Sequence, residues 1–151
     1  MKKMLLALLP VYIVATGLAG CDKEDIADTE SNNNISVSNI SYSLCDNTLS
    51  SNEYIKYYAL NDSTLGFEHK QMVNCNLDSC NVKLEYENDE IVIDVYDYGD
   101  DSNCLCPVKI NYEIRNLKKN NPYSFTFKRH SLVLHKCKIT FTLNTVETVN
   151  L

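Results

Sequence analysis

Strict alternation of apolar and polar residues is the feature that most limits what this chain can fold into. Residues 108–115 carry Val, Ile, Tyr and Ile at every second position, with Lys, Asn, Glu and Arg between them. Successive side chains of a strand point to opposite faces, so this pattern predicts a strand with one buried and one solvated face. The same alternation recurs in residues 81–96, 123–128 and 133–143.

Turn-forming residues separate these runs and predict hairpins. Asn and Asp at positions 88–89 interrupt residues 81–96, and Asn, Asp and Ser at 61–63 separate residues 54–60 from 64–69. Short two-faced strands with turns about ten residues apart are typical of antiparallel sandwiches and barrels, and two packed sheets are favoured over a closed barrel. The sequence therefore predicts an all-β fold, an antiparallel β-sandwich that is immunoglobulin-like or related, with about seven strands.

Glycine is scarce after residue 20, where it occurs only as Gly66 and Gly99. Asparagine also tolerates the left-handed backbone conformation that tight turns require. We therefore expect asparagine to occupy most of these turn positions.

Residues 1–20 predict a cleavable secretion signal. Lys2 and Lys3 precede an uncharged run that continues to Gly20 and ends in small residues. A transmembrane anchor is the alternative interpretation. The run is at the short limit for crossing about 30 Å of hydrocarbon, and Pro10 interrupts its helix. No basic stop-transfer cluster follows it, so the secretion signal is favoured.

The end of this signal, Leu18-Ala19-Gly20-Cys21, resembles the lipobox of bacterial lipoproteins. The resemblance implies that a diacylglycerol is attached to the thiol of Cys21, that the chain is cleaved before it, and that the new amino terminus is acylated. Several acyl chains hold a protein stably, whereas one chain binds only marginally. The membrane is therefore a predicted partner, bound through Cys21.

Residues 22–34 are polar and acidic and predict a flexible tether that spans about 20 Å on average. Its first four residues, Asp-Lys-Glu-Asp, resemble the surface-export signal of Bacteroidetes lipoproteins, whereas an Asp after the lipid-bearing cysteine retains enterobacterial lipoproteins in the inner membrane. We expect an outer-membrane lipoprotein exposed at the cell surface. The predicted organisation is a signal over 1–20, a lipidated cysteine and tether over 21–34, and a sandwich domain over 35–151.

Net charge limits the classes of partner. The full chain has a formal charge of −6, and loss of the two lysines in the signal lowers it to −8. Nucleic acids and anionic membrane faces attract clustered Lys and Arg. The sequence therefore predicts no nucleic-acid partner and leaves a protein or a glycan as the possible ligand.

Six cysteines remain when Cys21 is set aside, and an even number in an exported chain predicts three disulfides. Residues 104 and 106 flank one residue of a predicted strand and cannot pair without strain. That restriction leaves twelve of the fifteen possible connectivities. We also expect both of their sulfurs to point inward. The disulfide candidates are Cys45, Cys75, Cys80, Cys104, Cys106 and Cys137.

These cysteines have two alternative uses. Cys104 and Cys106 could bind a metal with His69 or His135, but structural zinc sites usually repeat pairs separated by two to four residues. Cys137 could act as a nucleophile beside His135, but this requires a free thiolate. Pairing in disulfides is favoured over both, and His135 is expected to be a hydrogen-bonded core histidine.

An acidic loop follows the predicted hairpin, with Asp94, Asp97, Asp100 and Asp101 around Gly99. Oxygen ligands on a flexible loop suit Ca²⁺, and a carboxylate pair can hydrolyse glycosides. The spacing matches no calcium-loop pattern, and nothing in the sequence fixes the separation of the carboxylates. A solvated loop is favoured, and no metal or cofactor is predicted.

Tyrosines offer a further candidate surface. The candidates for partial exposure are Tyr54, Tyr57, Tyr58, Tyr96 and Tyr98, and Tyr54 and Tyr58 fall on one face if residues 54–60 form a strand. Exposed tyrosines make adhesive patches for glycans or proteins. The alternative is that they reflect strand propensity alone.

The order of several segments resembles a group of small, mostly uncharacterised Bacteroidetes lipoproteins with a β-sandwich domain. The similar segments are LGFEHKQMVNC, VKLEYENDEIVIDVYD, and NCLCP running into VKINYEIRNL, followed by YSFTF. The resemblance covers roughly residues 54–143 and implies no established chemistry. The group's Leu-x-x-Gly-x-Tyr step is replaced here by residues 118–122 before Tyr123, which affects the expected turn more than the fold.

The leading functional hypothesis is a non-catalytic envelope lipoprotein that serves as a binding or structural module. No serine lies in a Gly-x-Ser-x-Gly elbow, and no nucleophile–base set is recognisable. No catalytic residue is therefore predicted. The alternative is an envelope-anchored enzyme or enzyme accessory that acts on polysaccharide or protein, with calcium bound at the acidic loop.

Overall fold

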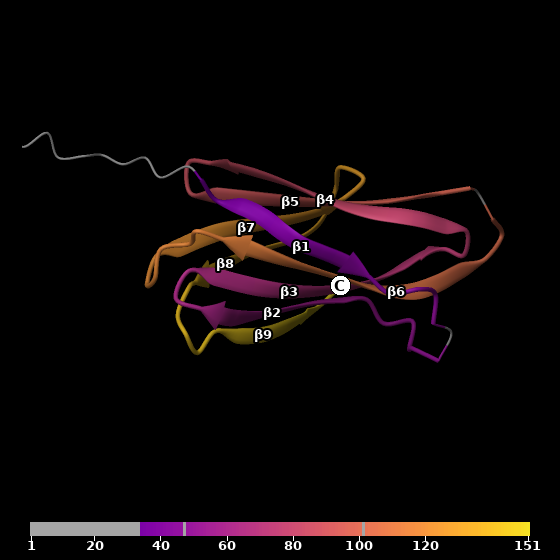
Figure 1. Cartoon of the computed structure of the whole chain (residues 1–151), viewed down its shortest axis with the longest axis horizontal. Helices are drawn as coiled ribbons and strands as arrows, with labels where there is room; N and C mark the ends of the chain where they lie inside the picture. The colour runs from indigo at the N-terminus through magenta and orange to yellow at the C-terminus, as the bar shows by residue number, and fades with distance from the viewer. Residues whose placement is uncertain (1–33, 47, 101) are drawn as a thin grey trace, which may run out of the picture. The chain divides into compact units, whose positions relative to one another are not determined.

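The computed structural model describes residues 34–46, 48–100 and 102–151. The regular structure of this part of the chain consists of nine strands (Figure 1). Within it, no helix is long and apolar enough to cross a membrane. The strands are β1 (Ser36–Tyr42), β2 (Tyr54–Asn61), β3 (Thr64–Asn74), β4 (Leu77–Glu87), β5 (Glu90–Gly99), β6 (Leu105–Arg115), β7 (Pro122–Arg129), β8 (Leu132–Thr140) and β9 (Val146–Asn150).

These strands form two packed sheets, which confirms the predicted all-β sandwich. One sheet has the order β1-β6-β3-β2-β9 and the other has the order β4-β5-β7-β8. Among the described residues there are nine strands where about seven were expected. The sandwich is also not purely antiparallel, because β5 and β7 pair in parallel. The chain leaves β5, crosses to the other sheet as β6 and returns as β7, which brings two strands of the same direction together.

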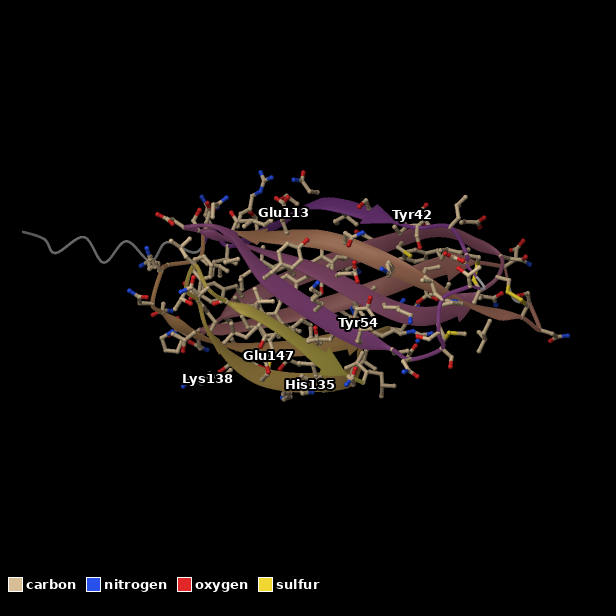
Figure 2. All side chains as sticks on the ribbon, turned by 90° about the horizontal axis from the view of Figure 1, so that it is seen from below. Tyr42, Tyr54, Glu113, His135, Lys138 and Glu147 are labelled. Carbon is tan, nitrogen blue, oxygen red and sulfur yellow. A yellow bond between two sulfur atoms is a disulfide. The ribbon has the colours of Figure 1, made fainter. Side chains whose placement is uncertain are left out.

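Edges of the two sheets meet on one side of the sandwich, where β1 contacts β4. The Tyr42 hydroxyl donates a hydrogen bond to the carbonyl of Asp78 at 2.9 Å, which ties β1 to β4. On the opposite side the edges are β9 and β8. Figure 2 shows Glu147, Lys138 and His135 on that side, away from Tyr42.

The core lies between the sheets and is built from the inward positions of the alternating runs. Phe67 of β3 is central to it. Its ring is stacked on Tyr112 of the same sheet at 5.2 Å and lies 5.8 Å and 5.9 Å from Phe125 and Phe127 of the opposite sheet. Such aromatic pairs stabilise a core beyond the effect of the area they bury. Other fully buried members are Ile55, Leu65, Ile91, Ile93, Val95, Val108, Ile110 and Ile114.

The predicted hairpin of residues 81–96 is confirmed as part of β4 and β5. Asn88 and Asp89 form its turn, with φ values of 53° and 60°. Asn39, Asn116 and Asn120 also have positive φ, and no described glycine does. Asparagine therefore occupies most of the left-handed positions, as expected.

The run predicted over residues 133–143 is shorter in the structure. β8 ends at Thr140, and a tight turn leads to β9. In this turn Thr142 N donates to Thr145 Oγ1 at 2.9 Å, and Thr145 N donates to the Thr142 carbonyl at 3.1 Å. These hydrogen bonds replace the ladder that a longer β8 would have required.

The amino-terminal predictions fall outside the described residues. These are the signal over 1–20, the lipidated Cys21, the export signal and nearly all of the tether. Ile35, at the start of the predicted domain, is buried and belongs to the core.

Candidate functional site

Two disulfides form among the six candidate cysteines. Cys45 pairs with Cys106, and Cys75 pairs with Cys104. The backbone of Cys75 also donates to the carbonyl of Cys104 at 3.0 Å, so the second disulfide continues the β3–β6 ladder. The expectation that both sulfurs of Cys104 and Cys106 point into the core is wrong for Cys104. It precedes β6 and is exposed, whereas Cys106 is fully buried.

The third predicted disulfide is absent, because Cys80 and Cys137 are free thiols. They lie on β4 and β8, the opposite edges of the four-stranded sheet. Three strand spacings separate these edges by about 14 Å. A disulfide needs Cα atoms within about 7 Å, so these two cysteines cannot pair.

The structure does not assemble the alternative metal site of Cys104, Cys106 and a histidine, because the sulfurs of both cysteines are bonded in disulfides. The sulfurs of Cys45, Cys75 and Cys106 do lie within 4.8 Å of one another. Their closeness follows from two adjacent disulfides at one end of the sandwich.

Cys137 and His135 lie two residues apart on the inward face of β8, opposite Phe125 and Phe127 of β7. Burial, reinforced by the carboxylate of Glu147, raises the pKa of the Cys137 thiol to about 11. At neutral pH this thiol is protonated and is a poor nucleophile. Within the described residues no hydrogen bond joins it to His135, and His135 is half-buried rather than a hydrogen-bonded core residue.

The acidic loop does not converge on one point. Asp94 lies on the outer face of β5, where it accepts hydrogen bonds from Ser131 N and from the Tyr96 hydroxyl. Asp97 faces the other sheet and contacts Gln71. Asp100 is exposed, and Asp101 lies outside the described residues. Asp94 and Asp97 therefore cannot share a ligand sphere.

A polar cluster between the sheets was not anticipated from the sequence. Asp97 Oδ1 accepts from Gln71 Nε2 at 3.3 Å, lies 2.8 Å from His130 Nε2 and lies 3.6 Å from Arg129 Nε. Arg129 also lies 3.4 Å from Glu53 Oε1. The alternating pattern of β3 and β5 could have indicated this cluster, because Gln71 and Asp97 are polar residues at inward positions. Their partners lie in other segments of the chain, so the pattern could not show which residues meet.

His69 is fully buried beside this cluster, between Ile55 and Ile110 of the neighbouring strands. Neither ring nitrogen has a hydrogen-bond partner among the described residues. Burial, with a smaller contribution from the Arg129 guanidinium, lowers the pKa of His69 to about 4. The imidazole is therefore neutral at pH 7.

The tyrosines do not form a single patch. Tyr57 is buried, and its hydroxyl donates to Glu147. Tyr54 is partly exposed on the five-stranded sheet, where it donates to Glu68 at 2.5 Å (Figure 2). Tyr96 and Tyr98 are stacked at 6.3 Å on the other sheet. Each ring already has a neighbour that orients it.

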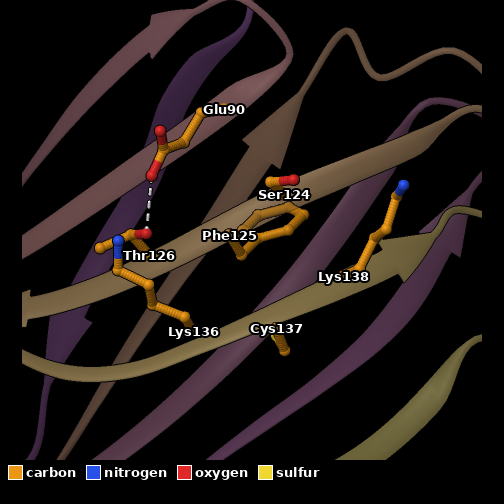
Figure 3. A pocket seen from close by; sticks show the side chains of 7 residues that line it. All are labelled: Glu90, Ser124, Phe125, Thr126, Lys136, Cys137 and Lys138. Carbon is orange, nitrogen blue, oxygen red and sulfur yellow. Dashed lines mark hydrogen bonds between the residues drawn. The ribbon is translucent and has the colours of Figure 1, made fainter.

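An open hollow lies on the outer face of the four-stranded sheet, where β5, β7 and β8 lie side by side. We call it the β7–β8 hollow. It has a volume of about 380 Å³ (Figure 3). Its lining residues are Glu90, Ser124, Phe125, Thr126, Lys136, Cys137 and Lys138.

Strand pairing places these side chains. Thr126 is opposite Lys136, and Ser124 is opposite Lys138 and beside Glu90. A Thr126 hydroxyl donates to Glu90 Oε1 at 2.8 Å across the parallel pair. Phe125 and Cys137, at the intervening positions, turn their side chains toward the interior (Figure 3). The outward side chains of the hollow are therefore polar or charged.

The two lysines of the hollow carry unpaired positive charge. Lys136 and Lys138 are both exposed, and neither forms an ion pair within the described residues. Glu90 is the acid in the lining, and it is engaged by Thr126. The arrangement can receive an anionic group at the lysines and hydroxyl groups at Ser124 and Glu90.

The sequence placed Ser124, Thr126, Lys136 and Lys138 on outward positions of two strands but did not single them out as a site. It could not show that β5 pairs in parallel with β7 and so brings Glu90 beside them. Comparison of the chain with protein-family models, with curated proteins and with solved structures found no match.

Proposed function

We propose that this protein is a non-catalytic binding module that a lipid on Cys21 holds at the bacterial cell envelope. The observation that carries the proposal is the β7–β8 hollow, an open polar depression on a paired sheet. Because sandwiches host unrelated functions, the site and not the fold supports this assignment.

The chemistry of the hollow favours binding over catalysis. Ser124 is the hydroxyl nucleophile nearest to the solvent there, but no histidine lines the hollow to deprotonate it. Cys137 turns its thiol to the opposite face of β8, and its raised pKa keeps it protonated. A set of donors and acceptors held on hydrogen-bonded strands is well suited to recognise a polar ligand without transforming it.

Attachment and display are part of the same proposal. The lipobox ending at Cys21 supplies the anchor, and residues 22–34 supply a tether of about 20 Å on average. The acidic export signal at 22–25 supports display at the outer surface of the outer membrane.

Binding is tested with the full chain on a panel of immobilised glycans and envelope proteins. Ser124→Trp fills the β7–β8 hollow and is expected to abolish binding to any captured ligand. Lys56→Trp places the same side chain on an exposed position of the other sheet and is expected to have no effect. Turnover of a substrate in a hydrolase panel, lost in a point variant, would contradict the non-catalytic proposal.

Anchoring is tested separately by metabolic labelling with an alkyne-bearing palmitate. The wild-type chain is expected to incorporate the label and to fractionate with membranes, and Cys21→Ala is expected to do neither. Protease treatment of intact cells then checks surface display. Labelling that persists in Cys21→Ala would overturn the anchor assignment.

A further inference from the structure

The charge around the β7–β8 hollow changes sign across the sheet. Lys136 and Lys138 lie at its β8 side and are free of ion pairs within the described part of the chain. A neighbouring depression on the β4–β5 side is lined by Glu85, Glu87 and Glu90. Other lysines of this sheet, such as Lys83 and Lys128, are also free of ion pairs among the described residues, so it is the presence of both Lys136 and Lys138 in one hollow that favours an anionic ligand there.

Spacing along β8 fixes where negative charge is received. Lys136 and Lys138 stand two residues apart on one face of a strand, which separates their backbones by about 7 Å. Flexible side chains of this length can bring both ammonium groups to one carboxylate or to two successive ones. Opposite them on β7 stand Thr126 and Ser124.

The acid of the hollow makes the site unsuitable for a densely charged polymer. Glu90 borders the lysines, with the acids of the β4–β5 depression beyond it, so a continuous run of negative charges meets repulsion there. A carboxylate is, however, a strong acceptor for hydroxyl donors. Ser124 adds a hydroxyl that can donate or accept. The hollow therefore matches a ligand that combines a negative charge with several hydroxyl groups.

We propose that the β7–β8 hollow binds an acidic sugar, a hexuronate residue whose carboxylate contacts Lys136 and Lys138 while its ring hydroxyls contact Ser124 and Glu90. This inference rests on the proposed binding function and names its ligand class. Phe125 is 1 % exposed, so its ring cannot stack on a sugar and recognition depends on polar contacts. Such binding is expected to weaken with added salt.

The test uses the full chain in neutral detergent and, as the probe, a tetramer of one galacturonate and three neutral galactose residues, with affinity measured by calorimetry. The double variant Lys136→Gln/Lys138→Gln is expected to lose about tenfold or more in affinity. Lys118→Gln/Lys119→Gln removes the same charge from an exposed turn and is expected to bind like the wild type.

Two further probes separate the sugar from the charge. The methyl ester of the same tetramer keeps the hydroxyls and lacks the charge, and a glutamate oligomer keeps the charge and lacks the hydroxyls. Both are expected to bind at least about tenfold more weakly than the galacturonate. Glu90→Gln is expected to improve binding of the glutamate oligomer, because it removes the repulsive charge.

The outcomes distinguish this inference from the proposed function. Equal binding of the ester and the acid, or binding unaffected by the two lysine changes, overturns the acidic-sugar assignment and leaves a binding module. Preference for the glutamate oligomer overturns it in favour of simple anion binding. If no glycan or envelope protein on the panel binds the wild type, the proposed function fails together with the inference.

Discussion

Gln71 Nε2 donates a hydrogen bond of 3.3 Å to Asp97 Oδ1, and this contact joins β3 of one sheet to β5 of the other. The same oxygen lies near Arg129 Nε, and Arg129 in turn reaches Glu53. Glu53 accepts from the backbone of Met72 at 2.6 Å. The two sheets are thus linked at this end by a chain of polar contacts in addition to the aromatic core.

Removal of Asp97 is expected to destabilise the sandwich. Asp97→Ala leaves Gln71 and Arg129 without their shared acceptor, and we expect a loss of about 2–3 kcal/mol in the free energy of unfolding. Asp97→Asn keeps an acceptor and is expected to lose less. The measurement is urea denaturation. Asp100→Ala, a change at an exposed acid of the same run, is expected to stay within about 0.5 kcal/mol, and an equal loss there would contradict the proposed role of Asp97.

Burial of His69 predicts a specific pH dependence of stability. The folded-state pKa is lowered to about 4 from an ordinary value of 6.5, so between these values the unfolded chain binds more protons. The free energy of unfolding is therefore not reduced by His69 above pH 6.5, and it decreases as the pH falls from 6.5 to 4 because the unfolded chain takes up a proton there. One pKa unit corresponds to about 1.4 kcal/mol, so we expect a loss of about 2–3 kcal/mol between pH 7 and 4.5.

The matched variant isolates this contribution from the other titrating groups. Between pH 7 and 4.5, the free energy of unfolding of His69→Leu is expected to decrease by about 2–3 kcal/mol less than that of the wild type. Denaturation in urea at both pH values gives the comparison. Identical pH dependence in the two proteins would show that His69 can be protonated in the folded state.

Local patterns predicted the strands well, because each depends on the alternation of neighbouring residues. The hairpin around Asn88 and the inward position of Phe67 follow directly from that alternation. The parallel pairing of β5 with β7 does not, because it is decided by how the chain crosses between sheets. The early end of β8 at Thr140 was missed because the alternating pattern continues through the turn.

The candidate site was harder to predict for the same reason. Lys136 and Lys138 are recognisable as outward residues of one strand, but Glu90 joins them only through the parallel pair. The disulfides show a related limit. The even number of cysteines favours complete pairing, yet Cys80 and Cys137 lie on opposite edges of one sheet and are free. The number of cysteines alone cannot show how far apart two of them lie in the fold.

The two free thiols make a prediction that mass spectrometry can check. Reduction of the full chain is expected to add four hydrogens, as two disulfides require, and not six. Alkylation without reduction is expected to modify Cys80 and Cys137 rapidly in urea. In the folded protein at pH 8 their alkylation is expected to be roughly 100-fold slower, because burial raises both thiol pKa values to about 11.

A different result would contradict this pairing of the cysteines. If no thiol is labelled in urea and reduction adds six hydrogens, a third disulfide links the edges of the sheet and the pairing of β4 through β8 must differ. Cys80→Ser and Cys137→Ser each remove one alkylation site and serve as the assignment controls.

The two glycines of the sandwich are expected to respond differently to the same substitution. A Cβ at Gly99 would lie 1.9 Å from the carbonyl oxygen of Asn76, which is backbone and follows the disulfide-bonded Cys75. The disulfide restricts movement of that segment, so Gly99→Ala is expected to reduce the free energy of unfolding by about 2 kcal/mol or more.

At Gly66 the nearest atom to an added Cβ is Cε2 of Tyr58, at 2.9 Å. This atom is the far end of a partly exposed side chain, which can turn away, so Gly66→Ala is expected to change stability by about 1 kcal/mol or less. In a Tyr58→Ala background the same change is expected to be neutral or stabilising, because the ring is gone. Thermal denaturation of the wild type, the Gly66→Ala, Gly99→Ala and Tyr58→Ala variants, and the Tyr58→Ala/Gly66→Ala double variant gives the comparison. Equal effects at Gly66 and Gly99 would show that the segment at Asn76 moves as freely as a side chain, despite the adjoining disulfide.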